Sequence, residues 1–146
     1  MVSMKDTIAG MLAGRIPMPP VARLIGFRMT KCEQGEATFE LEAGPQHANP
    51  MGTLHGGILA DVSDASMGMA YASTLPDGWT FTTIEHKINY MRPVWSDRLV
   101  AVGRVIKAGK LIALLECDIT DSKGNLVAHA TSTCMALEET VARPQR

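Results

Sequence analysis

The chain has 146 residues, of which 46% are hydrophobic and 20% are charged, and its formal net charge is −1. This length and composition predict one globular domain over residues 1–146, and they exclude a disordered chain or a surface built for nucleic acid. The three cysteines, Cys32, Cys117 and Cys134, lie far apart in the sequence. Their spacing predicts neither a disulfide framework nor a metal site, and it favours a reducing, cytoplasmic location.

Residues 1–20 predict a short amphipathic helix followed by a proline-rich lead-in. Met4, Ile8 and Met11 follow one another at helical spacing. The prolines that come next end this helix, because proline lacks an N–H and its ring clashes with the preceding turn. Charged residues interrupt the first ten positions, so we expect no secretory signal. We also expect no membrane span, since the richest apolar stretch contains two aspartates.

Two elements are predicted in the middle of the chain. From Gly35 to Ala43, apolar and polar residues alternate strictly, which is typical of a half-exposed strand. Residues 44–51 indicate a loop, and a long helix is predicted from Thr53 or Leu54 to Ser73. The residues inside this helix are small and apolar on nearly every side, which indicates a helix surrounded by protein.

The second half of the chain predicts four strands, separated by the turn signals RPVWSD, KAGK and DSKGN. Short turns between successive strands predict an antiparallel meander. The order of helix, strand, long helix and four strands predicts an α+β fold, in which an antiparallel sheet of five or more strands curls around one central helix. We expect the four strands at residues 82–91, 98–106, 111–120 and 126–137.

Polar residues and glycines gather where the loop becomes the long helix. Gly56 and Gly57 at a helix start leave backbone N–H groups unshielded, and the helix dipole adds partial positive charge at that end. Such a terminus can polarise a carbonyl oxygen. The alternative is that the two glycines only allow close packing against the sheet.

Two carboxylates follow inside the same helix. Asp64 is flanked by apolar residues, and burying a carboxylate costs free energy unless it is paired or hydrogen-bonded, so activation of a water molecule is one reason for its presence. Asp61 lies three residues earlier on the same face. Either aspartate can instead lie at the surface or at a subunit contact, and the pattern alone does not choose between them.

Other side chains with catalytic potential are assigned structural roles. We expect His55 to cap or orient the helix start, and His86 to be a hydrogen-bonded core histidine on the apolar face of its strand. No serine nucleophile is expected, because the chain has no G-x-S-x-G motif and Ser63, Ser66 and Ser73 have no histidine at a useful spacing. No metal-binding motif is present either, and we expect neither a metal nor a cofactor.

The chain resembles the hotdog-fold acyl-CoA thioesterases at Asn49–Asp64, which reads N-P-M-G-T-L-H-G-G-I-L-A-D-V-S-D. The resemblance is to the PaaI-like branch, of the phenylacetate-pathway and thioesterase superfamily member 2 type. A second match is Thr83–Pro93, T-I-E-H-K-I-N-Y-M-R-P, which is similar to the family's strand ending in Y-hydrophobic-x-P. The resemblance extends from about Pro20 to Leu137 and implies a hotdog fold that hydrolyses acyl-CoA.

The resemblance also implies roles for single residues. The family's acidic catalyst lies nine positions after the histidine of H-G-G, which makes Asp64 the general base on water or the nucleophile. Asp61 departs from the family, which usually has a small or apolar residue there. The Gly56 N–H is implied to polarise the thioester carbonyl. Further residues are implied to position the reacting groups and the water: Asn49, His55 and Thr83.

The contacts of the substrate are predicted only in outline. Cations are expected near the coenzyme, with Arg92, Lys107 and Lys110 as the candidates and Gly57 as a further contact. An aromatic or medium-chain acyl group needs an apolar pocket. Its candidate lining residues serve equally well as core: Met67, Met69, Tyr71, Trp79, Phe81 and Met91.

Helix geometry predicts a site that two chains share. Gly56 and Asp64 are eight residues apart, which is about 12 Å along a helix axis, so one carbonyl cannot touch both. We therefore expect a homodimer or homotetramer in which Gly56 of one protomer works with the partner subunit's Asp64.

Two other functions fit the same scaffold. A non-catalytic module that binds acyl-CoA or an acyl chain is the main alternative, because a fold does not fix a function. A hotdog dehydratase is less well supported, because its hydration motif is not seen in this chain.

Overall fold

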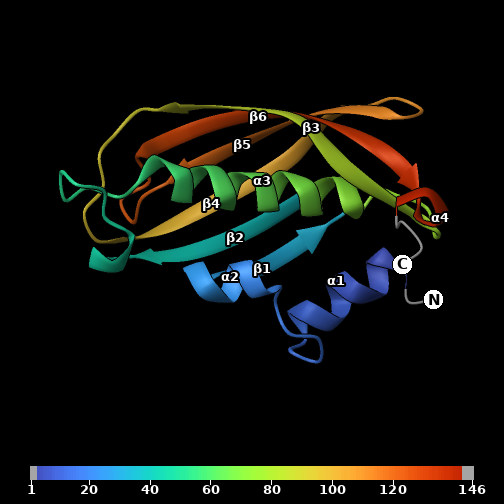
Figure 1. Ribbon diagram of the computed structural model, residues 1–146, viewed down its shortest axis with the longest axis horizontal. Helices are drawn as coiled ribbons and strands as arrows, with labels where there is room; N and C mark the ends of the chain where they lie inside the picture. The colour runs from blue at the N-terminus through green and yellow to red at the C-terminus, as the bar shows by residue number, and fades with distance from the viewer. Residues whose placement is uncertain (1–2, 143–146) are drawn as a thin grey trace.

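In the computed structural model, which describes residues 3–142, the long helix α3 runs along the concave face of a curled sheet (Figure 1). The sheet has six strands in the order β1-β2-β4-β5-β6-β3, and every pair is antiparallel. The predicted α+β fold class is confirmed. The elements are α1 (Met4–Leu12), α2 (Pro20–Ile25), β1 (Phe27–Glu33), β2 (Glu36–Ala43), the 3-10 helix η1 (Pro45–His47), α3 (Gly56–Ala72), β3 (Trp79–Tyr90), β4 (Asp97–Ala108), β5 (Ile112–Thr120), β6 (Leu126–Glu138) and α4 (Glu139–Ala142).

The core lies between α3 and the concave face of the sheet. In β2, Phe39 and Leu41 are buried toward α3, while Glu40 between them is more exposed, as the alternation predicted. From α3, Met67 and Tyr71 are buried against the sheet. The apolar alternation of the strands and the apolar side of the helix therefore meet in one layer.

The helix approaches the middle of the sheet most closely at Gly103 in β4. A Cβ at this position would overlap the backbone of Ser66 and lie 2.6 Å from the backbone nitrogen of Met67. Only glycine leaves room for the α3 backbone there. Gly103 therefore sets the depth at which α3 lies in the sheet.

Three of the four strands in the second half form the predicted meander, but the fourth does not. β4, β5 and β6 pair in succession, whereas β3 pairs with β6 at an edge of the sheet. Residues 91–96 carry the chain from this edge to the middle of the sheet, and there the Leu54 N–H donates to Val94 O at 2.7 Å. The prediction of four successive neighbours was wrong because a turn signal marks where a strand ends and not which strand pairs next.

Two elements before β2 were not predicted. The short helix α2 ends at Gly26, whose φ of 99° is favourable only for glycine. In β1, Phe27 and Met29 are buried, and a bulge between Met29 and Lys31 then breaks the alternation. Because the bulge interrupts the alternation of buried and exposed residues in β1, the remaining pattern is too short to be recognised in the sequence. β1 adds the sixth strand and forms the second edge of the sheet.

The long helix begins at Gly56, two or three residues later than predicted. The backbone before it is already committed to other partners, since the His55 N–H donates to His47 O at 2.8 Å. The prediction that protein surrounds α3 on nearly every side was wrong for the single chain. An open stripe along α3 faces away from the sheet, with Gly57 and Asp61 exposed, and Asp64 lies half-buried at the border between this stripe and β3. The residues on this stripe are mostly small and resemble core residues, so the sequence did not indicate that the stripe is exposed.

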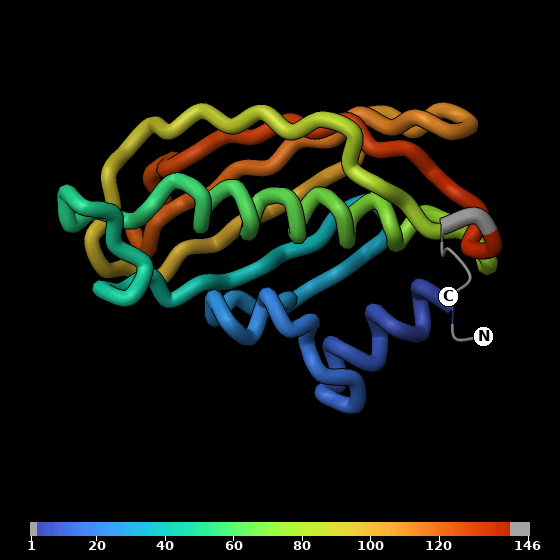
Figure 2. Tube along the Cα trace, in the orientation of Figure 1, coloured from blue at the N-terminus to red at the C-terminus, as the bar shows by residue number. Residues whose placement is uncertain are grey.

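The N-terminal segment lies beside β1 (Figure 2), and α1 also contacts α3. His47 links this segment to the loop before α3. Its Nε2–H donates to Ile25 O at 2.7 Å, and its Nδ1 accepts the Gly44 N–H at 3.2 Å. Within residues 3–142, no helix combines the length and the apolar character that crossing a membrane requires.

Candidate active site

The edge strand β3 lies along α3, and we call four of the contacts between them the α3–β3 seam. Two of the contacts involve the residues with the clearest chemical potential, the first residue of α3 and the half-buried carboxylate in its middle. The seam thereby connects both to a single strand. Its pairs are Tyr90 with Gly56, His86 with Ser63, Thr83 with Asp64, and Phe81 with Gly68.

Gly56 begins α3 directly under the ring of Tyr90. A Cβ on Gly56 would lie 2.7 Å from Tyr90 Cζ, so a side chain at this position would displace the ring. The Tyr90 hydroxyl donates to Gly56 O at 3.0 Å. Among residues 3–142, no group accepts a hydrogen bond from the Gly56 N–H. This N–H is therefore available to an external acceptor at the positive end of the helix dipole.

His55 is the N-cap residue of α3. Its Nδ1 accepts the Gly57 N–H at 2.9 Å, and the imidazole is exposed. The Nδ1 acceptor role leaves the proton of a neutral ring on Nε2. The Gly57 N–H, a predicted substrate contact, is thus occupied by His55 in this chain.

Asn49 organises the turn that precedes α3. Its Oδ1 accepts the N–H groups of Met51 and Thr53 at 2.9 and 3.2 Å, and its Nδ2 donates to Thr53 Oγ1 at 2.9 Å. An amide nitrogen carries two hydrogens, so the second hydrogen on Nδ2 stays free for a ligand. Asn49 both closes the turn and lines the cavity beside Gly56.

Asp64 is half-buried and faces the edge strand, whereas Asp61 is exposed on the open stripe. Thr83 Oγ1 donates to Asp64 Oδ1 at 3.0 Å, which leaves Oδ2 without a partner among the described side chains. The two aspartates, which the sequence alone did not separate, therefore differ in environment. Asp64 has the position and the partner expected of a carboxylate with a function.

Ser63 and His86 form a contact that the sequence did not indicate. Ser63 Oγ lies 2.9 Å from His86 Nε2 and donates to Ala60 O at 3.0 Å. No histidine lies at a useful spacing from Ser63 in the sequence, but the packing of β3 against α3 brings His86 to it from 23 positions away. Ser63 is fully buried, so the pair fixes the seam and offers no nucleophile to a substrate.

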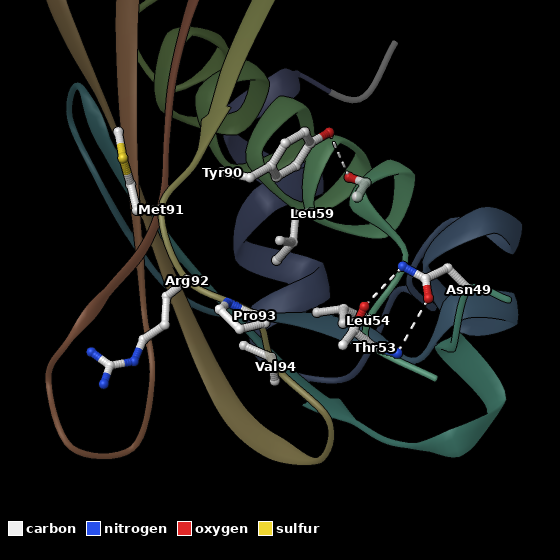
Figure 3. Close-up of a pocket in the computed structure, with 10 residues that line it drawn as sticks. Asn49, Thr53, Leu54, Leu59, Tyr90, Met91, Arg92, Pro93 and Val94 are labelled. Atoms are coloured by element: carbon white, nitrogen blue, oxygen red, sulfur yellow. Dashed lines mark hydrogen bonds between the residues drawn. The ribbon is translucent and has the colours of Figure 1, made fainter. Parts of the chain in front are cut away.

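A cavity of about 390 Å³ opens at the start of α3. Asn49, Gly56 and Tyr90 line it, and Figure 3 shows Asn49 and Tyr90 on either side of the helix start. Arg92 lies at its margin with its side chain pointing away from both, and its Nε is 4.0 Å from Asp121 Oδ2. The volume is in the range of small-molecule pockets.

Lys107 lies near the end of β4, and Lys110 lies in the turn that follows; these two are the other predicted cations. Lys107 is ten residues along β4 from Asp97, which at ~3.3 Å per residue is a distance of roughly 33 Å. Both lysines are exposed near the turn between β4 and β5. Within one chain the structure does not bring them together with Gly56.

The six candidate acyl-pocket residues separate into three groups. Met67 and Tyr71 belong to the buried core. Met91 lines the cavity at the start of α3, and Met69 lines a second cavity on the other side of the helix. The remaining two are partly buried and pack against the core: Trp79 and Phe81.

The cysteines are free thiols at the sheet. Cys117 and Cys134 are buried, and Cys32 is half-buried. Burial raises the pKa of the Cys117 thiol to about 12. Among the residues that the structure describes, no cluster of three or more His, Cys, Asp or Glu side chains has the arrangement of a metal site.

A curled antiparallel sheet around one helix, with glycines at the helix start and a carboxylate within it, defines the class of hotdog-fold thioesterases. Comparison with known proteins agrees with this class. The chain belongs to the thioesterase superfamily, whose sequence model matches residues 51–128, more than half of its length. It is a thioester hydrolase, and the activity supported at the family level is hydrolysis of acyl-CoA.

Individual relatives are similar over most of the chain and place it in the PaaI-like branch. Acyl-coenzyme A thioesterase 13 of Homo sapiens is 27% identical over 136 residues, which cover 91% of this chain and 96% of the relative. The medium/long-chain acyl-CoA thioesterase YigI of Escherichia coli (strain K12) is 24% identical, covering 80% of this chain and 84% of the relative. A solved structure of a phenylacetic acid degradation-related protein from Ralstonia eutropha JMP134 is 28% identical with a TM-score of 0.81, covering 88% of this chain and 98% of that one.

Proposed function

We propose that this protein hydrolyses an acyl-CoA with an aromatic or medium-chain acyl group to the free acid and CoA, without a cofactor, by water that Asp64 activates. The observation that carries the proposal is the pairing, on one helix, of an unoccupied N–H at Gly56 with a half-buried carboxylate at Asp64. Thioester hydrolysis needs these two functions, an oxyanion donor and a base for the attacking water.

The reaction follows from the atoms that are free. Asp64 Oδ2 takes a proton from water as the water oxygen attacks the carbonyl carbon, while Thr83 holds the other carboxylate oxygen. The Gly56 N–H donates to the developing oxyanion, and His55 and Asn49 fix the backbone that carries it. The C–S bond then breaks, and the proton on Asp64 passes to the departing thiolate.

The site is proposed to form between two protomers. Gly56 and Asp64 are separated by about 12 Å along α3, so the same carbonyl cannot reach both within one chain. The edge strand β3 and the open stripe of α3 are the surfaces available to a partner. Two apolar side chains at this edge, Ile84 and Met91, are each 56% exposed. A homodimer, or a homotetramer built from such dimers, would cover them.

The coenzyme contacts are proposed with the same geometry in view. Arg92 is the cation closest to the cavity at the start of α3. Lys107 and Lys110 lie too far away within one chain, so they contact CoA only if an assembled partner supplies them. A cytoplasmic location, where acyl-CoA is found with reduced thiols, stays a prediction from the free cysteines.

Replacement of the two helix aspartates tests the proposal. We expect Asp64→Asn to lower kcat for acyl-CoA hydrolysis by ~10³-fold or more, because the amide keeps the shape and removes the base. Asp61→Asn is the matched control, since it makes the same change on the exposed stripe, and we expect it to keep most of the activity. Release of free CoA thiol from a panel of acyl-CoAs measures both.

The opposite order of effects would show that Asp61 is the base. Binding of acyl-CoA to the wild type without turnover of any member of the panel would instead support the non-catalytic binding module. Calorimetric titration with acyl-CoA separates that outcome from an inactive preparation.

A further inference from the structure

A second cavity, of about 310 Å³, lies on the side of α3 away from β3. α1 contributes Met4 and Met11 to its lining, the segment between α1 and α2 contributes Met18, and α3 contributes Ala65 and Met69. The cavity is partly open to the surface, and its volume is in the range of ligand pockets.

The lining of this cavity is apolar. Phe27 and Phe39 contribute an edge-to-face aromatic pair with ring centroids 5.9 Å apart. Thr7 is the only lining residue with a polar side chain, and its hydroxyl already donates to Ser3 O at 3.1 Å. An occupant of the cavity would find no free side-chain donor or acceptor, so it must be a hydrocarbon group.

Methionine provides four of the lining side chains, which are unbranched and flexible and can adapt to occupants of different length. Adaptable walls suit a linear chain more than a rigid ring.

The cavity begins next to the proposed base. Ala65 follows Asp64 in α3 and is turned about 100° around the helix axis, away from β3 and toward α1. On a helix about 10 Å across, this turn corresponds to an arc of roughly 9 Å. An extended chain advances about 1.2 Å per bond, so roughly seven bonds span the arc.

Resting on the proposed thioesterase function, we infer that the distal part of a linear aliphatic acyl chain occupies this cavity. The first carbons of the chain cross the open stripe of α3 near Asp64, and the carbons beyond about the eighth lie among the methionines. Of the two proposed substrate classes, aromatic and medium-chain acyl-CoA, this placement favours the aliphatic one. The ring of a short aromatic acyl group, held a bond or two from the carbonyl, would stay on the open stripe and never reach Met69.

The test uses the wild type and variants on a series of acyl-CoAs from butanoyl to hexadecanoyl, with phenylacetyl-CoA beside them. We expect kcat/KM of the wild type to rise at least tenfold between octanoyl and dodecanoyl, because each buried methylene contributes about 0.8 kcal/mol. Ala22→Leu adds volume inside the cavity and should remove this rise. Leu24→Trp is the matched control, because Leu24 lies on the same helix and is 86% exposed, and it should keep the wild-type profile.

A second variant keeps the test decisive if Ala22→Leu does not fold. Met11→Ala enlarges the cavity and should move the preferred chain length upward by one or two carbons. A flat chain-length profile, or profiles that neither variant changes, would overturn the inference while leaving the thioesterase proposal intact. Absence of hydrolysis for every acyl-CoA would refute the thioesterase itself. Sedimentation of Ala22→Leu tests whether a second copy of the chain covers the cavity instead. A changed oligomeric state together with an unchanged chain-length profile would show this, and it would also overturn the inference.

Discussion

The chemistry of this site rests on a few residues whose neighbours decide what they can do. The Gly56 N–H has no acceptor among the described residues because Gly56 is the first residue of α3, and a Cβ at this position would lie 2.7 Å from Tyr90 Cζ, so the ring would have to shift. Thr83 binds one carboxylate oxygen of Asp64, and no other residue that the structure describes binds the second one. Gly57 and His55, by contrast, satisfy each other. A glycine can therefore have a free N–H at one position of the helix start and a hydrogen-bonded N–H at the next.

Burial also controls the thiol of Cys117, and this gives a pH-dependence of stability. The pKa of this thiol is raised from 9.0 to about 12 in the folded chain. Above pH 9 the unfolded chain loses this proton while the folded chain keeps it, so stability that is fully present below pH 9 is lost as the pH rises toward 12. We expect Cys117 to lower the free energy of unfolding by up to about 1.4 kcal/mol per pH unit in this window. Urea unfolding at several pH values from 8 to 10.5 measures the slope.

The control is Cys117→Ala, which loses some packing energy at every pH but lacks the titrating thiol. Its curve should be lower and less steep than that of the wild type. Parallel curves for the two proteins would contradict the prediction.

At the scale of elements, two strands hold α3 from different directions. β4 supports the helix from below through the close approach at Gly103, and β3 holds its side through the α3–β3 seam. Both contacts place the backbone of α3 rather than a single side chain. The positions of Gly56 and Asp64 relative to a bound substrate therefore depend on how deep α3 lies in the sheet and on where β3 runs.

We expect Gly103→Ala to destabilise the fold by about 1–3 kcal/mol, because the added methyl group overlaps the backbone of Ser66 and Met67 and no flexible side chain can move aside. Chemical denaturation measures the change. Val102→Ala is the control on the neighbouring position, which is half-exposed, and it should cost less than about 1 kcal/mol. Equal losses for the two variants would mean that the close approach contributes nothing specific.

At the scale of the whole molecule, the single chain leaves an edge strand and a stripe of its central helix without a partner. Mixing two inactive variants tests whether a partner completes the site there. Asp64→Asn removes the proposed base, and Asn49→Ala removes the side chain that closes the turn before Gly56. In a mixed dimer one site carries both changes and the other carries neither. An equal mixture should regain about a quarter of the wild-type activity if subunits exchange at random.

Native mass spectrometry confirms the exchange and gives the oligomeric state. Full exchange with no recovered activity would place both groups of each site in one protomer. An active monomer in light scattering would exclude a shared site altogether.

The sequence by itself determined the elements with regular patterns, and it predicted where the site lies. The strict alternation of β2, the long helix and the glycines at its start are local signals, because period and turn chemistry depend on neighbouring residues. Only the tertiary structure decided that β3 pairs with β6, that His86 reaches Ser63, and that Asp64 rather than Asp61 faces a hydrogen-bond donor. These facts depend on strand pairing and on the direction of a helix face relative to the sheet. Both are set by contacts between residues far apart in the chain, which no local pattern contains.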